Sequence, residues 1–167
     1  LEYCEVINHL DENITIEEVR ALVSSKLGEL KNFDYTAVAN GLSQQLIYQM
    51  NVTRPSILTS CEDLNVQLEN AAYALLQPPA KVALKAAIQE RGVPMKINSG
   101  YRTIAQQQIL YNGRFVRDLP VAPPGASNHQ SGLALDIQDP QGWRPYLERY
   151  GWGWLGWKDP PHFDFYG

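Results

Sequence analysis

The sequence has few histidines, few cysteines and no excess of positive charge. Only three histidines and two cysteines occur among 167 residues, and 14 lysines and arginines are outnumbered by 18 acidic residues. The net charge of -4 argues against a general nucleic-acid binder, because neutralising phosphates requires a dense basic face. No apolar run approaches the roughly 20 residues that a membrane-spanning helix needs, so we expect no membrane span.

The two cysteines, Cys4 and Cys61, lie far apart in the sequence. Two cysteines do not define a disulfide framework, and this spacing does not match a cysteine-rich metal site. The favoured interpretation is that both are small buried residues. A single disulfide between them is the alternative in an oxidising compartment.

The chain is long enough, at 44% hydrophobic composition, for one well-cored domain with a small helical appendage. Thr15 and Glu18 form a capping-box pattern at the start of one apolar helical stripe, and Asp34 precedes a second stripe that ends near Met50. The first third of the chain is therefore predicted to be two helices.

A boundary is expected where Asn51–Pro55 interrupts the helical pattern, since a residue before proline disfavours helix. We therefore divide the chain into an N-terminal helical region, residues 1–52, and a second domain, residues 53–167. No internal repeat occurs in either part.

The second domain changes from helical to alternating patterns along its length. Its helices and strands do not alternate regularly, which favours an α+β fold with a small antiparallel sheet and flanking helices. The patterns predict helices over about 60–75, 80–91, 103–110 and 143–150, strands over 95–98, 133–137 and 162–165, and an aromatic-glycine turn over 152–157.

Two of the three histidines flank predicted strands. His129 precedes Asp136 by seven positions, so the histidine can stand at the mouth of a loop while the aspartate projects from the strand that follows. His162 begins a later strand that could pair beside the first. Two imidazoles and one carboxylate are a known ligand set for catalytic zinc, which keeps a further position for water or substrate.

A hydrolytic zinc site also needs a base and a positive partner for the developing oxyanion. Asp159 lies three residues before His162, across two stiff prolines, and is the predicted base. Arg102 follows a predicted strand and is the predicted cation. Each residue taken singly has a simpler interpretation: Asp159 as the opener of an Asp-Pro turn, and Arg102 as a surface ion-pair residue.

Three segments together resemble one family of zinc peptidases. The segments are Ser99–Thr103 (SGYRT), Pro124–Ile137 (PGASNHQSGLALDI) and Asp159–Phe163 (DPPHF). In this order they resemble the D-alanyl-D-alanine carboxypeptidase family, which includes the VanX and VanY types and phage L-alanyl-D-glutamate endolysins. The similarity covers roughly the C-terminal two thirds of the chain.

The resemblance implies that residues 53–167 form a zinc peptidase domain with His129, Asp136 and His162 as ligands to Zn²⁺. It places the acidic base on Asp159 and the substrate-positioning arginine on Arg102. Many members have glutamate at the base position, so this shorter aspartate is a departure. The implied substrate is the peptidoglycan stem peptide, and the implied location is the cell envelope or the extracellular space, as a monomer.

Several assignments stay open at this point. Removal of a terminal D-Ala is favoured over cleavage between L-Ala and D-Glu, and a non-catalytic binding module of the same fold is a third possibility. Ser127 is predicted by resemblance to contact the substrate backbone, although turn formation also explains it. Asp164 shares a strand face with His162, so it is either an alternative ligand to Asp136 or an acceptor that orients an imidazole.

Three tryptophans, Trp152, Trp154 and Trp157, fall in the predicted aromatic-glycine turn. They either line a substrate groove or form a packed corner with exposed ring edges, and the packed corner is favoured.

Overall fold

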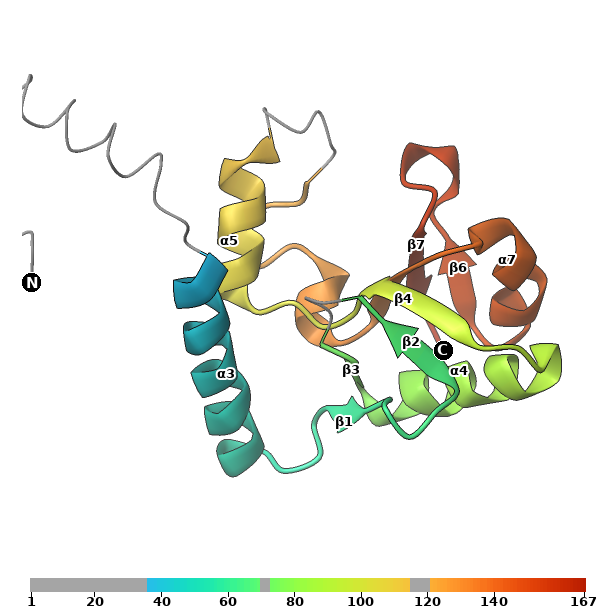
Figure 1. Cartoon of the computed structure of the whole chain (residues 1–167), viewed down its shortest axis with the longest axis horizontal. Coiled ribbons are helices and arrows are strands. Elements are labelled where there is room, and N and C mark those ends of the chain that lie inside the picture. The colour runs from blue at the N-terminus through green and yellow to red at the C-terminus, as the bar shows by residue number, and fades with distance from the viewer. Residues whose placement is uncertain (1–35, 70–72, 115–120) are drawn as a thin grey trace, which may run out of the picture. The chain divides into compact units, whose positions relative to one another are not determined.

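The computed structural model describes residues 36–69, 73–114 and 121–167 (Figure 1). The chain divides into two compact units, residues 1–36 and 37–167, and the second unit contains the described residues after Thr36. The predicted helix near Thr15, Cys4 and the third histidine of the chain, His9, lie outside the described residues. The division groups residues 37–53 with the sheet, whereas the sequence pattern places a boundary after residue 52.

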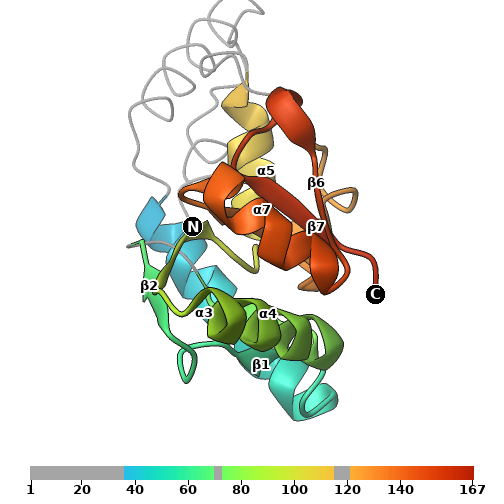
Figure 2. The same cartoon turned by 90° about the vertical axis from the view of Figure 1, so that its right-hand side faces the viewer.

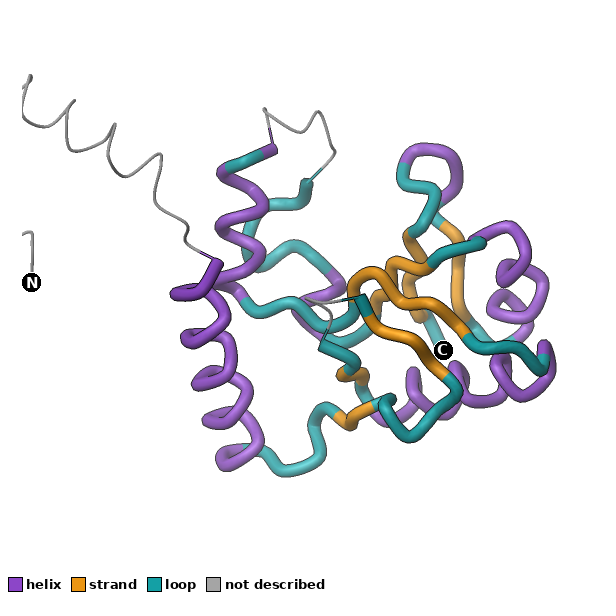
Figure 3. Tube along the Cα trace, viewed as in Figure 1, coloured by secondary structure: helices purple, strands orange, loops and turns teal. Residues whose placement is uncertain are grey.

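The described residues form short strands and longer helices (Figure 3). The helices are α3 (Thr36–Thr53), α4 (Pro78–Arg91), α5 (Ile104–Asn112) and α7 (Pro140–Arg149), with the 3-10 turns η1 (Asn128–Ser131) and η2 (Gly156–Lys158). The strands are β1 (Thr59–Ser60), β2 (Val66–Leu68), β3 (Leu75–Leu76), β4 (Met95–Ser99), β5 (Ala134–Ile137), β6 (Trp152–Trp154) and β7 (His162–Phe165). None of the described helices is long and apolar enough to cross a membrane.

The main sheet has five strands in the order β2-β4-β5-β7-β6. All of its pairings are antiparallel except the pairing of β2 with β4, which is parallel. A separate antiparallel pair joins β1 to β3. The predicted α+β class and the pairing of the two strands that carry Asp136 and His162 are confirmed.

The helix predicted over residues 60–75 is wrong. This stretch contains the end of β1, all of β2 and the start of β3, and β2 pairs with β4 from Val66 opposite Met95 to Leu68 opposite Ile97. Its apolar residues are spaced as on a helix, but Val66 and Leu68 also alternate with polar Gln67, as a strand requires. Pairing with a strand distant in the sequence decides between the two patterns, as tertiary contacts often do.

The aromatic-glycine turn predicted over 152–157 is only partly correct. Residues Trp152–Trp154 form strand β6, and only the following residues turn through η2. Trp152 and Trp154 point to one face of the sheet, and Gly153 between them occupies the other face. A side chain at Gly153 would collide with the ring of Tyr166, so the glycine allows close packing at this edge.

Two predicted helix boundaries are confirmed in detail. Helix α4 ends at Gly92, as its predicted range of 80–91 requires, and Gly92 adopts the left-handed conformation at φ 71°; its start is two residues earlier than predicted, with Pro78 at the first position. Helix α5 has the complete capping box: the Thr103 side chain accepts from the Gln106 backbone, and the Gln106 side chain accepts from the Thr103 backbone. This cap directly follows Arg102.

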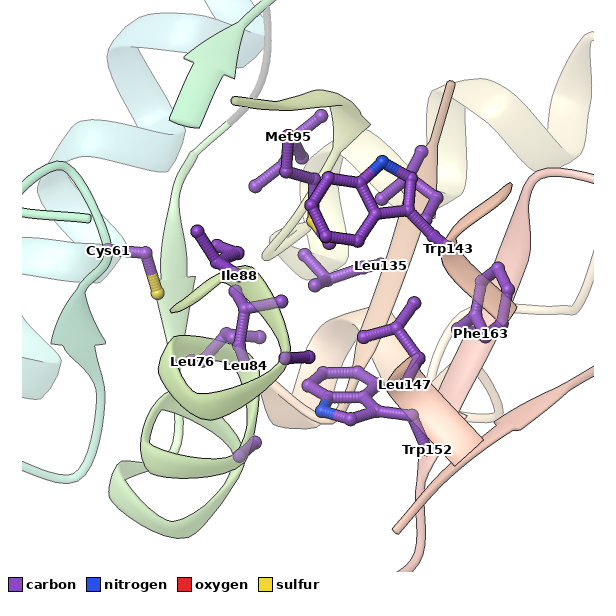
Figure 4. Packing of buried hydrophobic residues seen from close by; sticks show 14 of the residues in the cluster. Cys61, Leu76, Leu84, Ile88, Met95, Leu135, Trp143, Leu147, Trp152 and Phe163 are labelled. Carbon is purple, nitrogen blue, oxygen red and sulfur yellow. The ribbon is translucent and has the colours of Figure 1, made fainter. Parts of the chain in front are cut away.

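The hydrophobic core lies between α4, α7 and one face of the sheet (Figures 2 and 4). Successive side chains of a strand point to opposite faces, so every second residue of β5 and β7 enters this core. Leu135 and Phe163 are opposite each other in the register and are both buried. They pack with Trp143, Leu147, Leu84 and Trp152 from the neighbouring elements (Figure 4).

Candidate metal centre

The alternation that buries Leu135 and Phe163 turns Asp136 and His162 to the opposite face of the sheet. These two residues are directly opposite each other in the β5–β7 register. The third predicted ligand, His129, comes from η1, which leads into β5. The structure therefore brings all three predicted ligands together on one face, although they are up to 33 residues apart in the sequence.

The donor atoms of these residues converge on one point. Asp136 Oδ1 lies 2.9 Å from His162 Nδ1 and 3.3 Å from His129 Nε2. The two nitrogens, His129 Nε2 and His162 Nδ1, are 3.2 Å apart. Tetrahedral coordination at zinc bond lengths of about 2.0–2.1 Å separates neighbouring ligand atoms by about 3.3 Å. The spacing of the donor set therefore fits a zinc ion.

His129 is oriented by the backbone. Its side chain is buried, and its Nδ1 lies 2.7 Å from the carbonyl oxygen of Gly100, to which it donates. Nε2 is then left to face the other two ligands. A side chain at Gly100 would collide with the Tyr73 carbonyl oxygen, so glycine permits the close approach that places this acceptor.

His162 lies between two carboxylates. Its Nδ1 is 2.9 Å from Asp136 Oδ1, and its Nε2 is 2.9 Å from Asp164 Oδ1. Burial acts to lower the pKa of His162, but the hydrogen bonds and charges of the two carboxylates raise it to about 9. Burial acts to raise the pKa of Asp136, and the two histidines outweigh it and hold this pKa well below its usual range. Binding of a metal would therefore release a proton from this cluster.

Arg102 lies beside the ligands, as predicted. Its Nη2 is 3.5 Å from Asp136 Oδ2 and donates to Ser99 Oγ at 2.9 Å, and its Nη1 donates to Gln107 Oε1 at 2.9 Å. Burial lowers the pKa of Arg102, while the charges of Asp136 and Asp159 oppose that shift. The guanidinium is thus fixed as a partly buried cation at the edge of the donor cluster.

Asp159 ends η2 and begins the Asp-Pro-Pro turn that leads to β7. Its backbone carbonyl accepts from the amide of His162 at 3.1 Å, so the turn ties the two residues together. Burial and the charge of Asp136 raise the pKa of Asp159, while His162, His129 and Arg102 act to lower it. Its carboxyl group therefore interacts with the charged residues of the cluster and has an increased affinity for a proton.

The other residues singled out in the sequence lie outside the group of three donor residues. Ser127 caps η1 without a side-chain hydrogen bond to it, beside the ligand segment. Asp164 contacts the outer nitrogen of His162 and lies outside the three-residue donor group. Cys61 is a buried free thiol.

Trp152 and Trp154 pair with Phe165 and Phe163, so they lie on the core side of the sheet, opposite the donor cluster. Trp152 is buried, and Trp154 packs edge-on against Trp157 while its Nε1 donates to the Pro160 carbonyl. Arg144 of α7 lies over the Trp154 ring. Trp152 and Trp154 therefore belong to a packed corner, with Trp157 exposed at its outer side.

Comparison with known protein families gives a match over residues 66–151 to the model of VanY, D-alanyl-D-alanine carboxypeptidase. This match spans more than half of the chain and includes β2 to α7 with two of the three donor residues. The chain belongs to the VanY family. A comparison with curated protein sequences gave no match.

Solved structures support the VanY-family fold. The LD-carboxypeptidase LdcB superimposes with a TM-score of 0.53 at 23% identity, over 68% of this chain and 69% of that one. A D,D-pentapeptidase VanY from a VanB-type vancomycin-resistance cassette, solved with Zn(II), superimposes with a TM-score of 0.51 at 21% identity, over 66% of this chain and 78% of that one. VanYB in complex with D-alanine-D-alanine superimposes with a TM-score of 0.50 at 21% identity, over 66% of this chain and 77% of that one. These similarities concern the fold.

Sequence reasoning missed two residues that hold Arg102 in this VanY-family chain. Gln107 is buried, and besides accepting from Arg102 it donates to the Ala122 carbonyl at 2.7 Å. It stands among three consecutive glutamines, and nothing in their sequence distinguishes it. Ser99 follows a register shift between Ile97 and Ser99: Ile97 pairs with Ile137, but Ser99 pairs with Asp136. This irregularity turns Ser99 to the face of the donor cluster.

Proposed function

We propose that this chain is a zinc-dependent peptidase that hydrolyses D-amino-acid-containing peptide bonds of bacterial peptidoglycan. The observation that carries the proposal is the convergence of three donor atoms within 4.8 Å of one another, from His129, Asp136 and His162. Arg102 and Asp159 beside them supply the charge and the proton acceptor that a structural metal site does not need. Membership of the VanY family supports the substrate class.

Two imidazole nitrogens and one carboxylate oxygen suit Zn²⁺ and leave a position for water or substrate. Zinc bound there would polarise the scissile carbonyl and make a water molecule acidic enough to attack at neutral pH. The ligands are held in advance of binding, because Gly100 orients His129 and the strand register sets Asp136 opposite His162. This preorganised site is therefore expected to bind the metal more tightly than a mobile surface cluster of the same residues would.

The remaining residues would carry the proton and position the substrate. Asp159 accepts a proton from the attacking water and returns it to the leaving amine, and its raised pKa suits both steps. Arg102 donates to the oxygen on which negative charge develops, or to a substrate carboxylate, from a position already braced by Ser99 and Gln107. Ser127 contacts the substrate backbone from the mouth of η1.

Removal of the terminal D-Ala from a stem ending in D-Ala-D-Ala is the favoured reaction. The description of the matching family model carries this preference. LdcB is described as an LD-carboxypeptidase, so L,D cleavage is one alternative within the same fold. Endopeptidase cleavage between L-Ala and D-Glu is another. A peptidoglycan substrate places the enzyme outside the cytoplasmic membrane, and we propose that it acts as a monomer.

The decisive experiment offers the zinc-replete protein three substrates separately. They are a pentapeptide ending in D-Ala-D-Ala, a tetrapeptide ending in one D-Ala, and a muropeptide with an intact L-Ala–D-Glu bond. Mass spectrometry should detect loss of one D-Ala from the pentapeptide. A chelator should abolish cleavage, and added zinc should restore it. If none of the three substrates is cut by zinc-loaded, folded protein, the proposed function is wrong.

A substitution of Asp159 separates an enzyme from a binding module of the same fold. Asp159→Asn should reduce turnover by about 10²–10⁴-fold, the usual contribution of a general base. Zinc content should stay unchanged, because Asp159 is not one of the three donor residues. Asp63→Asn is the matched control, since Asp63 pairs with Lys81 at the surface. Wild-type turnover in Asp159→Asn would remove Asp159 from the mechanism.

A further inference from the structure

Asp164 is a largely buried carboxylate that the reaction itself does not use. Its side chain is two residues beyond His162 on β7 and faces the same side of the sheet. Asp164 Oδ1 lies 2.9 Å from His162 Nε2 and accepts from Asn128 Nδ2 at 3.0 Å. Asp164 Oδ2 accepts from the Tyr166 hydroxyl at 3.4 Å. Three donors therefore converge on one carboxylate.

These contacts determine which nitrogen of His162 faces the other ligands. An ionised carboxylate only accepts hydrogen bonds, so the proton in the bond to Asp164 belongs to His162 Nε2. Nδ1 is then the nitrogen directed to Asp136 Oδ1 and His129 Nε2. His129 has the opposite arrangement, because its Nδ1 donates to Gly100 and its Nε2 faces the cluster. The two histidines present different nitrogens for different local reasons.

We propose that Asp164 is a positioning residue of the metal centre, which keeps the proton on His162 Nε2 and aims Nδ1 at the metal. The hydrogen bond also increases the electron density that the imidazole offers through Nδ1. Through Asn128, the same carboxylate connects β7 to η1, the segment that carries His129. Asp164 thus links the two segments, η1 and β7, that supply the histidine ligands.

The geometry disfavours the two other roles open to Asp164. As a ligand it would have to face the donor cluster, but it contacts the nitrogen of His162 that points away from Asp136. As a purely structural residue it would need no contact with His162, since Asn128 and Tyr166 already satisfy its oxygens. A buried carboxylate is costly unless it is hydrogen-bonded, and here the shortest bond goes to the ligand histidine.

The first test measures zinc affinity by competition with a chromophoric chelator. Asp164→Ala should weaken zinc binding by about 10–100-fold, as loss of a partner to a ligating histidine typically does. Asp164→Asn, which keeps an acceptor oxygen without the charge, should fall between this variant and the wild type. Tyr166→Phe is the matched control: it removes only the contact to Oδ2 and should bind zinc as the wild type does. Wild-type affinity in folded Asp164→Ala would overturn the proposal.

The second test needs no variant and therefore does not depend on folding of Asp164→Ala. The ¹⁵N chemical shifts of the imidazole rings in the zinc-loaded wild type identify the metal-bound nitrogen of each histidine. We expect Nδ1 to be bound in His162, with a proton on Nε2, and Nε2 to be bound in His129. Zinc bound through Nε2 of His162 would contradict the proposal. A purely structural role for Asp164 predicts no such fixed proton.

The inference rests on the proposed zinc site but not on the proposed reaction. Both tests read metal binding, so they can succeed even if none of the peptide substrates is cut. In that case the peptidase proposal fails and the role of Asp164 stands. If peptides are cut and zinc affinity does not depend on Asp164, the reverse holds.

Discussion

The two faces of strands β5 and β7 have opposite chemistry although they share the same eight residues. On one face, Leu135 and Phe163 are buried against α4 and α7. On the other face, Asp136 and His162 lie opposite each other and form hydrogen bonds. Because side chains alternate along a strand, each residue of the core face lies directly between two residues of the site face.

This comparison shows how a small sheet can separate stability from chemistry. The core face needs only shape and apolar surface, whereas the site face needs particular atoms at particular distances. A register slip of one residue would exchange the two faces, so burial of Phe163 also determines where His162 points. The substitutions below act on one face at a time.

The largest effect is expected on the core face. Phe163→Ala should reduce the free energy of unfolding by about 3–5 kcal/mol, because it removes a fully buried ring and leaves a cavity. Urea denaturation followed by circular dichroism measures this change. Phe163→Leu, which keeps most of the volume, is the control and should cost less than half as much. Equal losses in both variants would mean that cavity formation is not the cause.

On the site face, Arg102→Ala should act on activity. We expect kcat/KM for the pentapeptide to fall by about 10²–10³-fold, the usual loss of one donor to a developing oxyanion. Arg102→Lys should recover little, since lysine does not reproduce the fork that donates to both Ser99 and Gln107. A fall in activity that is matched by loss of bound zinc would indicate a structural role for Arg102 instead.

A smaller effect is expected where α3 contacts the residue that caps α5. Ser43 Oγ and Thr103 Oγ1 form a buried hydrogen bond of 2.6 Å, and Thr103 is adjacent to Arg102. Ser43→Ala should reduce the free energy of unfolding by about 1–2 kcal/mol, because the buried Thr103 hydroxyl keeps only the Gln106 amide of its two hydrogen-bond partners. Thr53→Ala, at an exposed position of the same helix, should change it by less than about 0.5 kcal/mol. Chemical denaturation compares the two variants.

An effect that is absent at neutral pH concerns the buried thiol of Cys61. The pKa of this thiol is raised to about 12, mainly by burial, while the charge of Lys81 opposes the shift and that of Asp63 adds to it. The folded state therefore keeps the proton that the unfolded chain loses above about pH 8.5, and this contribution to stability declines as pH rises toward 12. The decline should be at most about 1.4 kcal/mol per pH unit.

The measurement compares the wild type with Cys61→Ala between pH 8 and 10. The variant should lack this part of the pH dependence, and thiol reagents should label Cys61 in a Cys4→Ala background only on unfolding. Rapid labelling of the folded protein at neutral pH would show that the thiol is accessible, contrary to its burial.

Local signals predicted much of the fold, and distant pairing explains the errors. The capping box at Thr103 and the glycine at the end of α4 depend on neighbouring residues alone, so they can be recognised in the sequence. Strand β2 depends on a partner, β4, that lies beyond α4 in the chain. Its apolar spacing fits both a helix and a strand, and only the partner decides between them.

The candidate site shows the same difference between what local sequence signals predict and what contacts between distant segments decide. Residue types and motif order brought His129, Asp136 and His162 into one hypothesis, and the structure places their donor atoms together. Sequence patterns could not specify which nitrogen each imidazole presents, because Gly100 and Asp164 determine this through contacts made only in the folded chain. The roles of the donor residues stay predictions until zinc binding is measured.

The register shift in β4 has a practical consequence for protein engineering. In β4, Met95 and Ile97 are fully buried, so only apolar residues of similar size will be accepted at these two positions. Ser99, at the end of the strand, instead pairs with Asp136 and accepts a hydrogen bond from Arg102. A mutant library that tests how Arg102 is held can therefore diversify Ser99 and leave Met95 and Ile97 unchanged.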